Sequence, residues 1–290
     1  MEDVINGCPK KQPTVEREQT RQGGAQLVRA SADGLLHISY DVVNASMICR
    51  PTTGDAVLVR WNDETCQGVE AYREGDTLYV KAQNVTSGGW LSRLVTFVGS
   101  RTDVTIEIPN GAKPSLRARS LSGDLDVQDV ELTEADFNTT SGDITLCPLS
   151  GSKLASIVAN TASGDVEVRA NADKLAVRSM SGDVEAISDC AELNVSSVSG
   201  DVNVRSDCVD AVVKSVSGDT EVEATNPALK RMQVSSTSGD VNLRLRCDSI
   251  NLHTSTVSGS VRSNIPNPND ANASAQVSVS SVSGDVNVSR

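Results

Sequence analysis

The sequence predicts an all-β protein built as a single-stranded parallel β-solenoid, and three observations support this fold class. A Ser-Gly-Asp motif is present in nine copies after residue 115, one of them with Ser in place of Asp. The glycines of successive copies are 18 to 25 residues apart. Apolar and polar residues alternate on both sides of each copy, and no segment has helical periodicity. A near-fixed period of this size is typical of solenoids in which each repeat is one coil. We therefore expect a β-helix, of right-handed sense, with about 18–22 residues per turn.

Each repeat contains two short strands with one buried face. Positions seven and five before the glycine are apolar, as are positions two and four after it, for example Leu193, Val195, Val202 and Val204 around Gly200. Each pair alternates with polar residues, which is the pattern of a half-buried strand. The position two before the glycine is also mostly apolar. In the alternation along the strand it falls on the same face as the glycine and as the positions two and four after it. We therefore expect this column to face inward, with a bend between five and two residues before the glycine.

Composition divides the chain into three parts. Residues 1–24 are charged and without periodicity, which predicts a flexible N-terminal tail. Residues 25–114 hold most of the aromatic residues and several β-patterned runs, and we expect an irregular β region that covers one end of the solenoid. Thr53-Gly54-Asp55 is a candidate for a degenerate first copy of the repeat. Residues 115–290 form the repeat array, and its last strand, which ends at Arg290, is expected to leave an open C-terminal end.

The net charge of −12 belongs mainly to the repeats, since residues 1–114 carry −2 and residues 115–290 carry −10. An acidic array repels phosphate backbones, so nucleic-acid binding is disfavoured. No run of about 18 apolar residues is present, so no membrane span is predicted. The N-terminus lacks the apolar core of a signal peptide, which predicts a cytoplasmic location, with an envelope-associated or exported protein as the alternative.

The seven cysteines contain no CxxC pair, so neither a zinc site nor a disulfide framework is indicated. Cys190 and Cys208 lie one 18-residue period apart and are expected on neighbouring coils. Coils about 4.8 Å apart are within reach of a disulfide, but a ladder of small buried thiols is the simpler interpretation.

The column that follows the glycine holds eight aspartates and one serine, Ser260. Stacked carboxylates about 4.8 Å apart repel by roughly 1 kcal/mol per pair in water, so something must offset that repulsion. The structural interpretation is that each Asp accepts hydrogen bonds at the corner. The functional alternative is a stripe of weak divalent-cation sites, with these candidate ligands: Asp165, Asp183, Asp201 and Asp219.

The Ser or Thr three residues before each glycine either satisfies hydrogen bonds at the bend or joins a flat hydroxyl array that could order water or bind glycans. No catalytic residue and no cofactor are predicted, because the two histidines, His37 and His253, are far apart and the common nucleophile, phosphate and zinc motifs are missing. Acid pairs such as Asp165 and Glu167 recur with the period, which indicates surface pattern rather than one unique site.

The S-x-SGD-V-x-V phrase, the strand-then-proline run Val104–Pro109 and the earlier strand Gly75–Val80 resemble the bacterial putative-adhesin domain family, a domain of unknown function. The resemblance covers residues 26–290 and implies a β-solenoid without a catalytic motif. Many members of that family are exported or envelope-linked.

We therefore expect a non-catalytic, adhesin-like scaffold that binds a protein or cell-envelope partner through its long acidic side or its open end. Two alternatives remain at this stage. One is a structural protein that assembles end to end as a homo-oligomer through the C-terminal end. The other is a carbohydrate-active β-helix enzyme.

Overall fold

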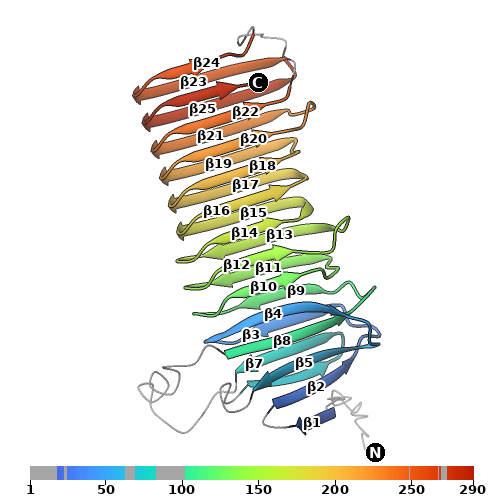
Figure 1. Ribbon diagram of the computed structural model, residues 1–290. Coiled ribbons are helices and arrows are strands. Elements are labelled where there is room, and N and C mark those ends of the chain that lie inside the picture. The colour runs from blue at the N-terminus through green and yellow to red at the C-terminus, as the bar shows by residue number, and fades with distance from the viewer. Residues whose placement is uncertain are drawn as a thin grey trace, which may run out of the picture.

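The computed structural model describes residues 18–22, 25–62, 69–82, 102–247, 249–266, 268 and 273–290. These residues form strands and connections, with no helix among them, and the strands stack into one elongated parallel β-solenoid (Figure 1). The all-β solenoid is therefore confirmed, while its handedness stays a prediction. The predicted tail, residues 1–24, lies mostly outside the described residues.

Two long sheets run along the molecule with their buried faces toward each other. Each coil contributes one strand to each sheet. Sheet 1 has twelve strands in this spatial order: β6 (Val69–Glu74), β7 (Thr77–Ala82), β3 (His37–Asp41), β9 (Ser115–Arg119), β11 (Glu134–Thr139), β13 (Lys153–Thr161), β15 (Asn171–Ser181), β17 (Cys190–Ser199), β19 (Asp210–Ser217), β21 (Arg231–Ser238), β25 (Ala275–Ser283) and β23 (Ile250–Ser258). Sheet 2 has fourteen: β1 (Glu18–Gln22), β2 (Ala25–Ser31), β5 (Ala56–Asn62), β8 (Thr102–Pro109), β4 (Ala45–Thr52), β10 (Leu125–Gln128), β12 (Ile144–Cys147), β14 (Val166–Arg169), β16 (Val184–Ser188), β18 (Val202–Ser206), β20 (Thr220–Ala224), β22 (Val241–Leu245), β26 (Val286–Ser289) and β24 (Val261–Ser263).

The core lies between the two sheets and follows the predicted columns. In the coil of Gly200, Leu193 and Val195 on β17 are buried, as are Val202 and Val204 on β18. The parallel register stacks like on like, with Val195 beside Val177 and Val202 beside Val184. Each fully buried Val or Leu side chain contributes roughly 1.5–3 kcal/mol, so the regular stack accumulates stability coil by coil.

The corner between the two strands differs from the expectation. Ser197, three residues before the glycine, is buried, whereas Val198 and Ser199 are both exposed. Two consecutive residues therefore point outward, and the face switches between Ser197 and Gly200. The expectation that the column two before the glycine faces inward is wrong. It assumed strict alternation of inward and outward residues, whereas two successive residues face outward here.

Close stacking of neighbouring coils explains why the repeated motif contains a glycine. A Cβ built on Gly200 would lie 2.3 Å from the carbonyl oxygen of Gly182, and φ at Gly200 is +119°. Only a residue without a side chain lets neighbouring coils approach this closely in this backbone conformation.

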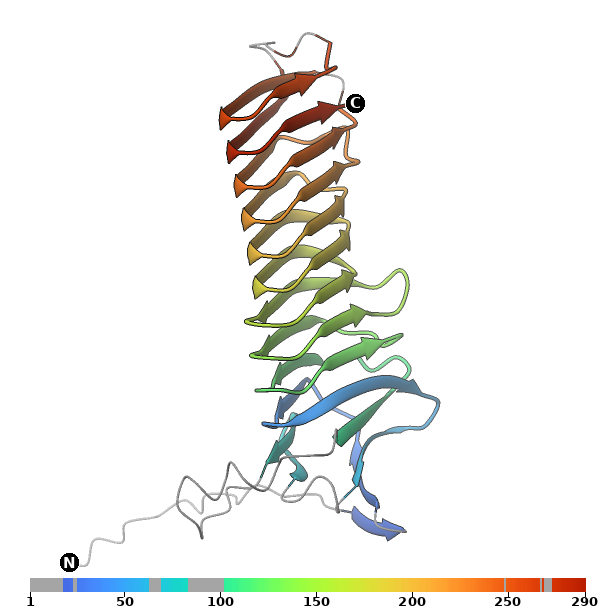
Figure 2. The same ribbon diagram turned by 60° about the vertical axis from the view of Figure 1, so that its left-hand side comes forward.

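The coils at the C-terminal end are not in sequence order. The last coil, β25–β26, lies between β21–β22 and β23–β24, so the coil of Gly259 closes the stack (Figures 1 and 2). The expectation that the last strand of the sequence forms the open end is therefore wrong. The carbonyl of Pro268 accepts the N–H of Leu252 at 2.7 Å, which covers part of the free edge of β23.

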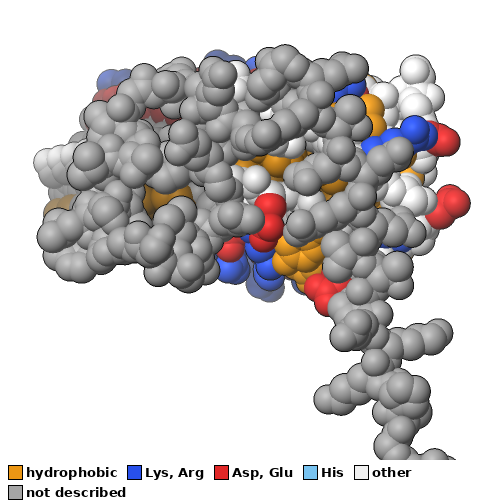
Figure 3. All heavy atoms as spheres, turned by 90° about the horizontal axis from the view of Figure 1, so that it is seen from below, with side chains coloured by type: hydrophobic (Ala, Val, Ile, Leu, Met, Phe, Trp, Pro, Cys, Tyr) orange, Lys and Arg blue, Asp and Glu red, His pale blue; other side chains and the backbone are white. Residues whose placement is uncertain are grey.

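The N-terminal strands extend the same two sheets. The coil β3–β4 lies between β7–β8 and β9–β10, and β5, β2 and β1 add antiparallel strands at the edge of sheet 2. The degenerate first corner is residues 43–46, not Thr53-Gly54-Asp55, because Met47 pairs with Leu125 while Gly54 lies in the turn between β4 and β5. Seen from below, the described residues that are visible at this end include hydrophobic, acidic and basic side chains (Figure 3).

Candidate binding surface

The aspartate column forms a hydrogen-bonded ladder along the corner. The Oδ1 atom of each Asp accepts the backbone N–H of the residue that follows the glycine in the adjacent coil, at 2.8 to 3.1 Å. For example, Asp201 accepts from Asp219 and donates to Asp183, both at 2.8 Å. Because carboxylate acceptors make hydrogen bonds stronger than neutral ones, the ladder offsets the repulsion between stacked charges.

The two ends of the ladder explain the exceptions in the column. At its start, Ser46 Oγ accepts the N–H of Asp124 at 3.1 Å. At its end, Ser260 donates its N–H to Asp285 at 2.8 Å, and no further coil of the described chain stacks beyond it. Because no further described coil offers an N–H to the side chain of Ser260, a carboxylate is not required at this position.

The four candidate cation ligands, Asp165, Asp183, Asp201 and Asp219, lie in this ladder, where each commits one oxygen to a backbone N–H. Calcium takes about six to eight oxygen ligands. No group of three or more His, Cys, Asp or Glu within the described ranges could hold a metal ion. The geometry favours the structural role, and a cation stripe stays an untested prediction.

The Ser and Thr residues three before the glycine face the interior rather than solvent. Members such as Thr161, Ser197 and Ser281 are at most 5% exposed. A flat hydroxyl array at this column is therefore wrong. Several of these hydroxyls lie near the stacked glycine carbonyls, as Thr161 Oγ1 does at 3.3 Å from the Gly142 oxygen.

An exposed row of mostly apolar side chains runs along the sharp edge of the coils, and we call it the corner ridge. It is formed by the residue two before each glycine and by its equivalent in the coil of β3 and β4; in spatial order its members are Val43, Leu121, Thr140, Ala162, Met180, Val198, Val216, Thr237, Val282 and Val257. Met180 is 61% exposed, Leu121 52% and Val198 47%. Seven of the ten exposed large hydrophobic side chains of the described residues belong to this ridge, so their exposure is not scattered.

The ridge has an acidic side and a weakly basic side. The eight aspartates of the ladder run beside it on the side of sheet 2. On the side of sheet 1, the column four before the glycine carries three exposed cations, Arg119, Arg178 and Lys214, among Ser and Asn residues, and Asp41 in the coil of β3 and β4. The ridge therefore combines an apolar line with an excess of negative charge along one flank.

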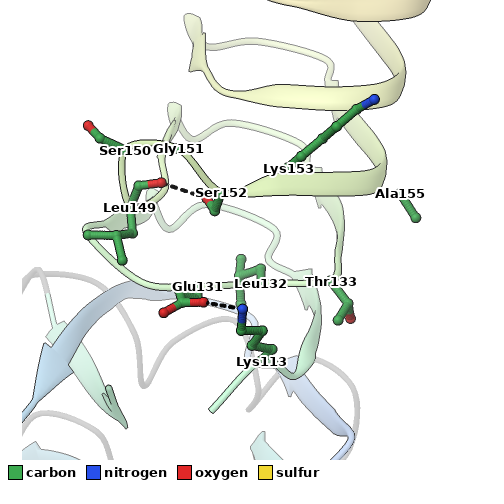
Figure 4. A pocket seen from close by; sticks show the side chains of 10 residues that line it. All are labelled: Lys113, Glu131, Leu132, Thr133, Leu149, Ser150, Gly151, Ser152, Lys153 and Ala155. Carbon is green, nitrogen blue, oxygen red and sulfur yellow. Dashed lines mark hydrogen bonds and ion pairs between the residues drawn. The ribbon is translucent and has the colours of Figure 1, made fainter. Parts of the chain in front are cut away.

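A cleft of about 520 Å³ opens on the opposite, loop side of the first repeats (Figure 4). Lys113 bonds Glu131 across it at 2.6 Å, and Lys153 bonds Asp173 at 2.6 Å. Leu132 and Leu149 add apolar surface. Among the described residues that line the cleft, Glu131 is the one carboxylate, whereas glycoside hydrolysis commonly uses a pair.

The remaining reactive side chains are dispersed. His37 bonds Ser115 at 2.7 Å near the N-terminal end, and His253 lies on β23 at the other end. Cys190 and Cys208 are buried free thiols. Burial raises the pKa of Cys208 to about 11 and also raises the pKa of Cys190, which keeps both thiols protonated near neutral pH.

Both the repeats and the fold are matched by known proteins. The family model described as Toastrack DUF4097 matches residues 35–289, and the chain belongs to this family. No curated protein matches the chain. The match to the family model confirms the predicted resemblance to a putative-adhesin domain of unknown function.

Two solved structures have the same fold. One is a putative lipid binding protein from Parabacteroides distasonis ATCC 8503, at 15% identity and a TM-score of 0.54, covering 91% of this chain and 95% of that one. The other is a putative adhesin from Parabacteroides distasonis ATCC 8503, at 10% identity and a TM-score of 0.52, covering 94% and 98%. At these identities the likeness concerns the fold. In the described part of the chain no helix has the length and apolarity to cross a bilayer.

Proposed function

We propose that the chain is a non-catalytic, adhesin-like scaffold that binds a macromolecular partner along the corner ridge. The ridge carries this proposal, because a folded protein in water rarely leaves seven large apolar side chains exposed along one edge unless something covers them. Its members sit on a rigid stack, held by the glycine contacts and the aspartate ladder, so the line is preorganised for binding.

The non-catalytic part of the proposal is supported by the separation of the two histidines and by the aspartates of the ladder, which are engaged in backbone hydrogen bonds that repeat in every coil. The cell-envelope part is supported by related structures of the same fold that are described as a putative adhesin and a putative lipid binding protein. A partner at the envelope is consistent with both descriptions.

The test is comparative capture from solubilised envelope fractions with the full-length protein as bait. We compare the wild-type chain with a double variant, V198T/V216T, which keeps the shape of the ridge but makes it polar. Threonine is already present in this column as Thr140 and Thr237, so the fold accepts it. The control double variant V158T/V212T changes two partly buried valines on the outer face of sheet 1.

Loss of a captured partner in the ridge variant, with retention in the control, is the expected result. Equal capture by all three proteins would show that binding does not use the ridge and would overturn the proposal.

A further inference from the structure

We infer that the partner of the corner ridge is a polypeptide surface that presents an apolar strip bordered along one side by Lys or Arg residues. This inference rests on the proposed function and names the chemistry of its partner. The observations that carry it are the length of the ridge, its apolar members and the asymmetric charge along its flanks.

The ridge is large enough for a specific protein interface. Its ten members span nine coil steps, or about 43 Å at about 4.8 Å per step. A standard interface buries about 800 Å² on each partner, so a strip about 19 Å wide is enough over this length. The residues from four before to one after the glycine span up to about 16 Å measured along the chain, which bends at the corner, so the partner has to follow a convex edge.

Charge determines which surfaces fit. The eight aspartates place about one negative charge per 4.8 Å along one flank, against three cations on the other. Both oxygens of a carboxylate can accept hydrogen bonds, and in Asp201 the ladder uses Oδ1. A partner with a row of cations on the matching side gains attraction along the whole row, whereas its apolar strip covers Met180, Val198 and Val216.

A second copy of this chain fits poorly. Each copy would bring eight aspartates and three cations to the ridge, and both copies carry a net charge of −12. Like-charge juxtaposition at an interface is strongly unfavourable.

A lipid surface fits poorly as well. Proteins that lie in the membrane interface use Lys and Arg together with Trp, Phe or Leu. The ridge has no aromatic member and one leucine, Leu121, and anionic lipids would repel the aspartate row.

The experiment uses the full-length protein and a synthetic amphipathic peptide with a leucine stripe and lysines along one side of it. Two control peptides replace the lysines by glutamates or the leucines by serines. Binding is measured by fluorescence anisotropy at low and high salt. We expect the leucine–lysine peptide to bind, more weakly as salt rises, and both control peptides to bind far less.

Variants of the protein locate the contact. V198T/V216T is expected to weaken binding by about tenfold or more, because two hydroxyls are then buried against the leucine stripe. D201N/D219N keeps the Oδ1 acceptors of the ladder and removes two charges, so it is expected to weaken binding by roughly threefold at low salt and little at high salt. V158T/V212T on sheet 1 and D189N/D207N, in the connections before β17 and β19, are the matched controls and are expected to bind like the wild type.

Binding that is unchanged in V198T/V216T, or equal binding of the lysine and glutamate peptides, would overturn the inference. So would ridge-dependent flotation with phosphatidylcholine or phosphatidylserine vesicles, or ridge-dependent self-association in sedimentation velocity. If the peptide fails while the capture from envelope fractions remains ridge-dependent, the inferred chemistry is wrong and the proposed function stands.

Discussion

Replacing Gly200 by alanine tests whether the Ser-Gly-Asp phrase is a requirement of coil stacking. The added Cβ would lie 2.3 Å from the Gly182 oxygen and 2.6 Å from its carbon, whereas carbon atoms prefer to approach to about 3.5–4.0 Å. The coils of Gly182 and Gly200 must therefore separate locally by about 1 Å, which weakens the hydrogen bonds from Gly182 N to Ser199 O and from Asp201 N to Asp183 Oδ1. Two weakened bonds cost about 1 kcal/mol each, and a side chain at positive φ costs about 1–2 kcal/mol more.

The expected destabilisation is roughly 3–4 kcal/mol, or a fall in Tm on the order of 10 °C in far-UV circular dichroism. Gly151 is the matched control, because its φ is +84° but no atom lies within 4 Å of an added Cβ. G151A should cost only the conformational strain of about 1–2 kcal/mol, or a few degrees. Equal melting temperatures for G200A and G151A would refute close stacking as the reason for the repeated glycine.

Three further predictions follow from the ladder and the buried thiols. D219A removes the acceptor of the Asp240 N–H and should lower the free energy of unfolding by about 1–2 kcal/mol, whereas S260D should leave it unchanged; denaturant titrations in which S260D is more stable than the wild type would contradict the conclusion that the ladder ends at Ser260. Millimolar calcium should not change the Tm, and a rise that D183N/D201N abolishes would instead support the cation stripe. Burial raises the pKa of Cys49 to about 12 and that of Cys208 to about 11, above an unfolded value of about 8.5, so their contribution to stability is present below pH ~8.5 and is lost as the pH rises toward the folded values. Urea titrations at pH 7.5 and 10 should show this loss, and a smaller loss in C208A; equal losses in both proteins would argue against the thiol as the cause.

Much of the fold could be predicted because each coil repeats the same physical requirement. In the coil of Gly200, Val195 and Val202 mark the inward faces, and period and parity suffice to place their equivalents in the other repeats except the closing coil, where Val261 is exposed. The corner could not be predicted from parity, since Val198 is apolar yet exposed, and apolarity alone does not reveal which face a residue takes. The ridge was missed for that reason, although its members were recognised as a column.

The spatial order of the last coils could not be predicted from the sequence pattern either. Near-identical repeats such as those around Gly239, Gly259 and Gly284 can pair in more than one order with similar contacts, so local pattern does not choose between them. One signal was available in the sequence. Ser260 breaks the aspartate column, and the closing coil of the stack does not require that carboxylate because no further coil in the described structure offers it an N–H.

The most direct measurement of the central claim compares V198T/V216T with V158T/V212T, in the same preparations, for both melting temperature and capture of an envelope partner. We predict that both variants melt within about 2 °C of the wild-type protein, because surface substitutions usually change stability by less than about 0.5 kcal/mol. We further predict that only the ridge variant loses the partner. Capture that survives in V198T/V216T while its fold is intact would contradict the claim that the corner ridge is the binding surface.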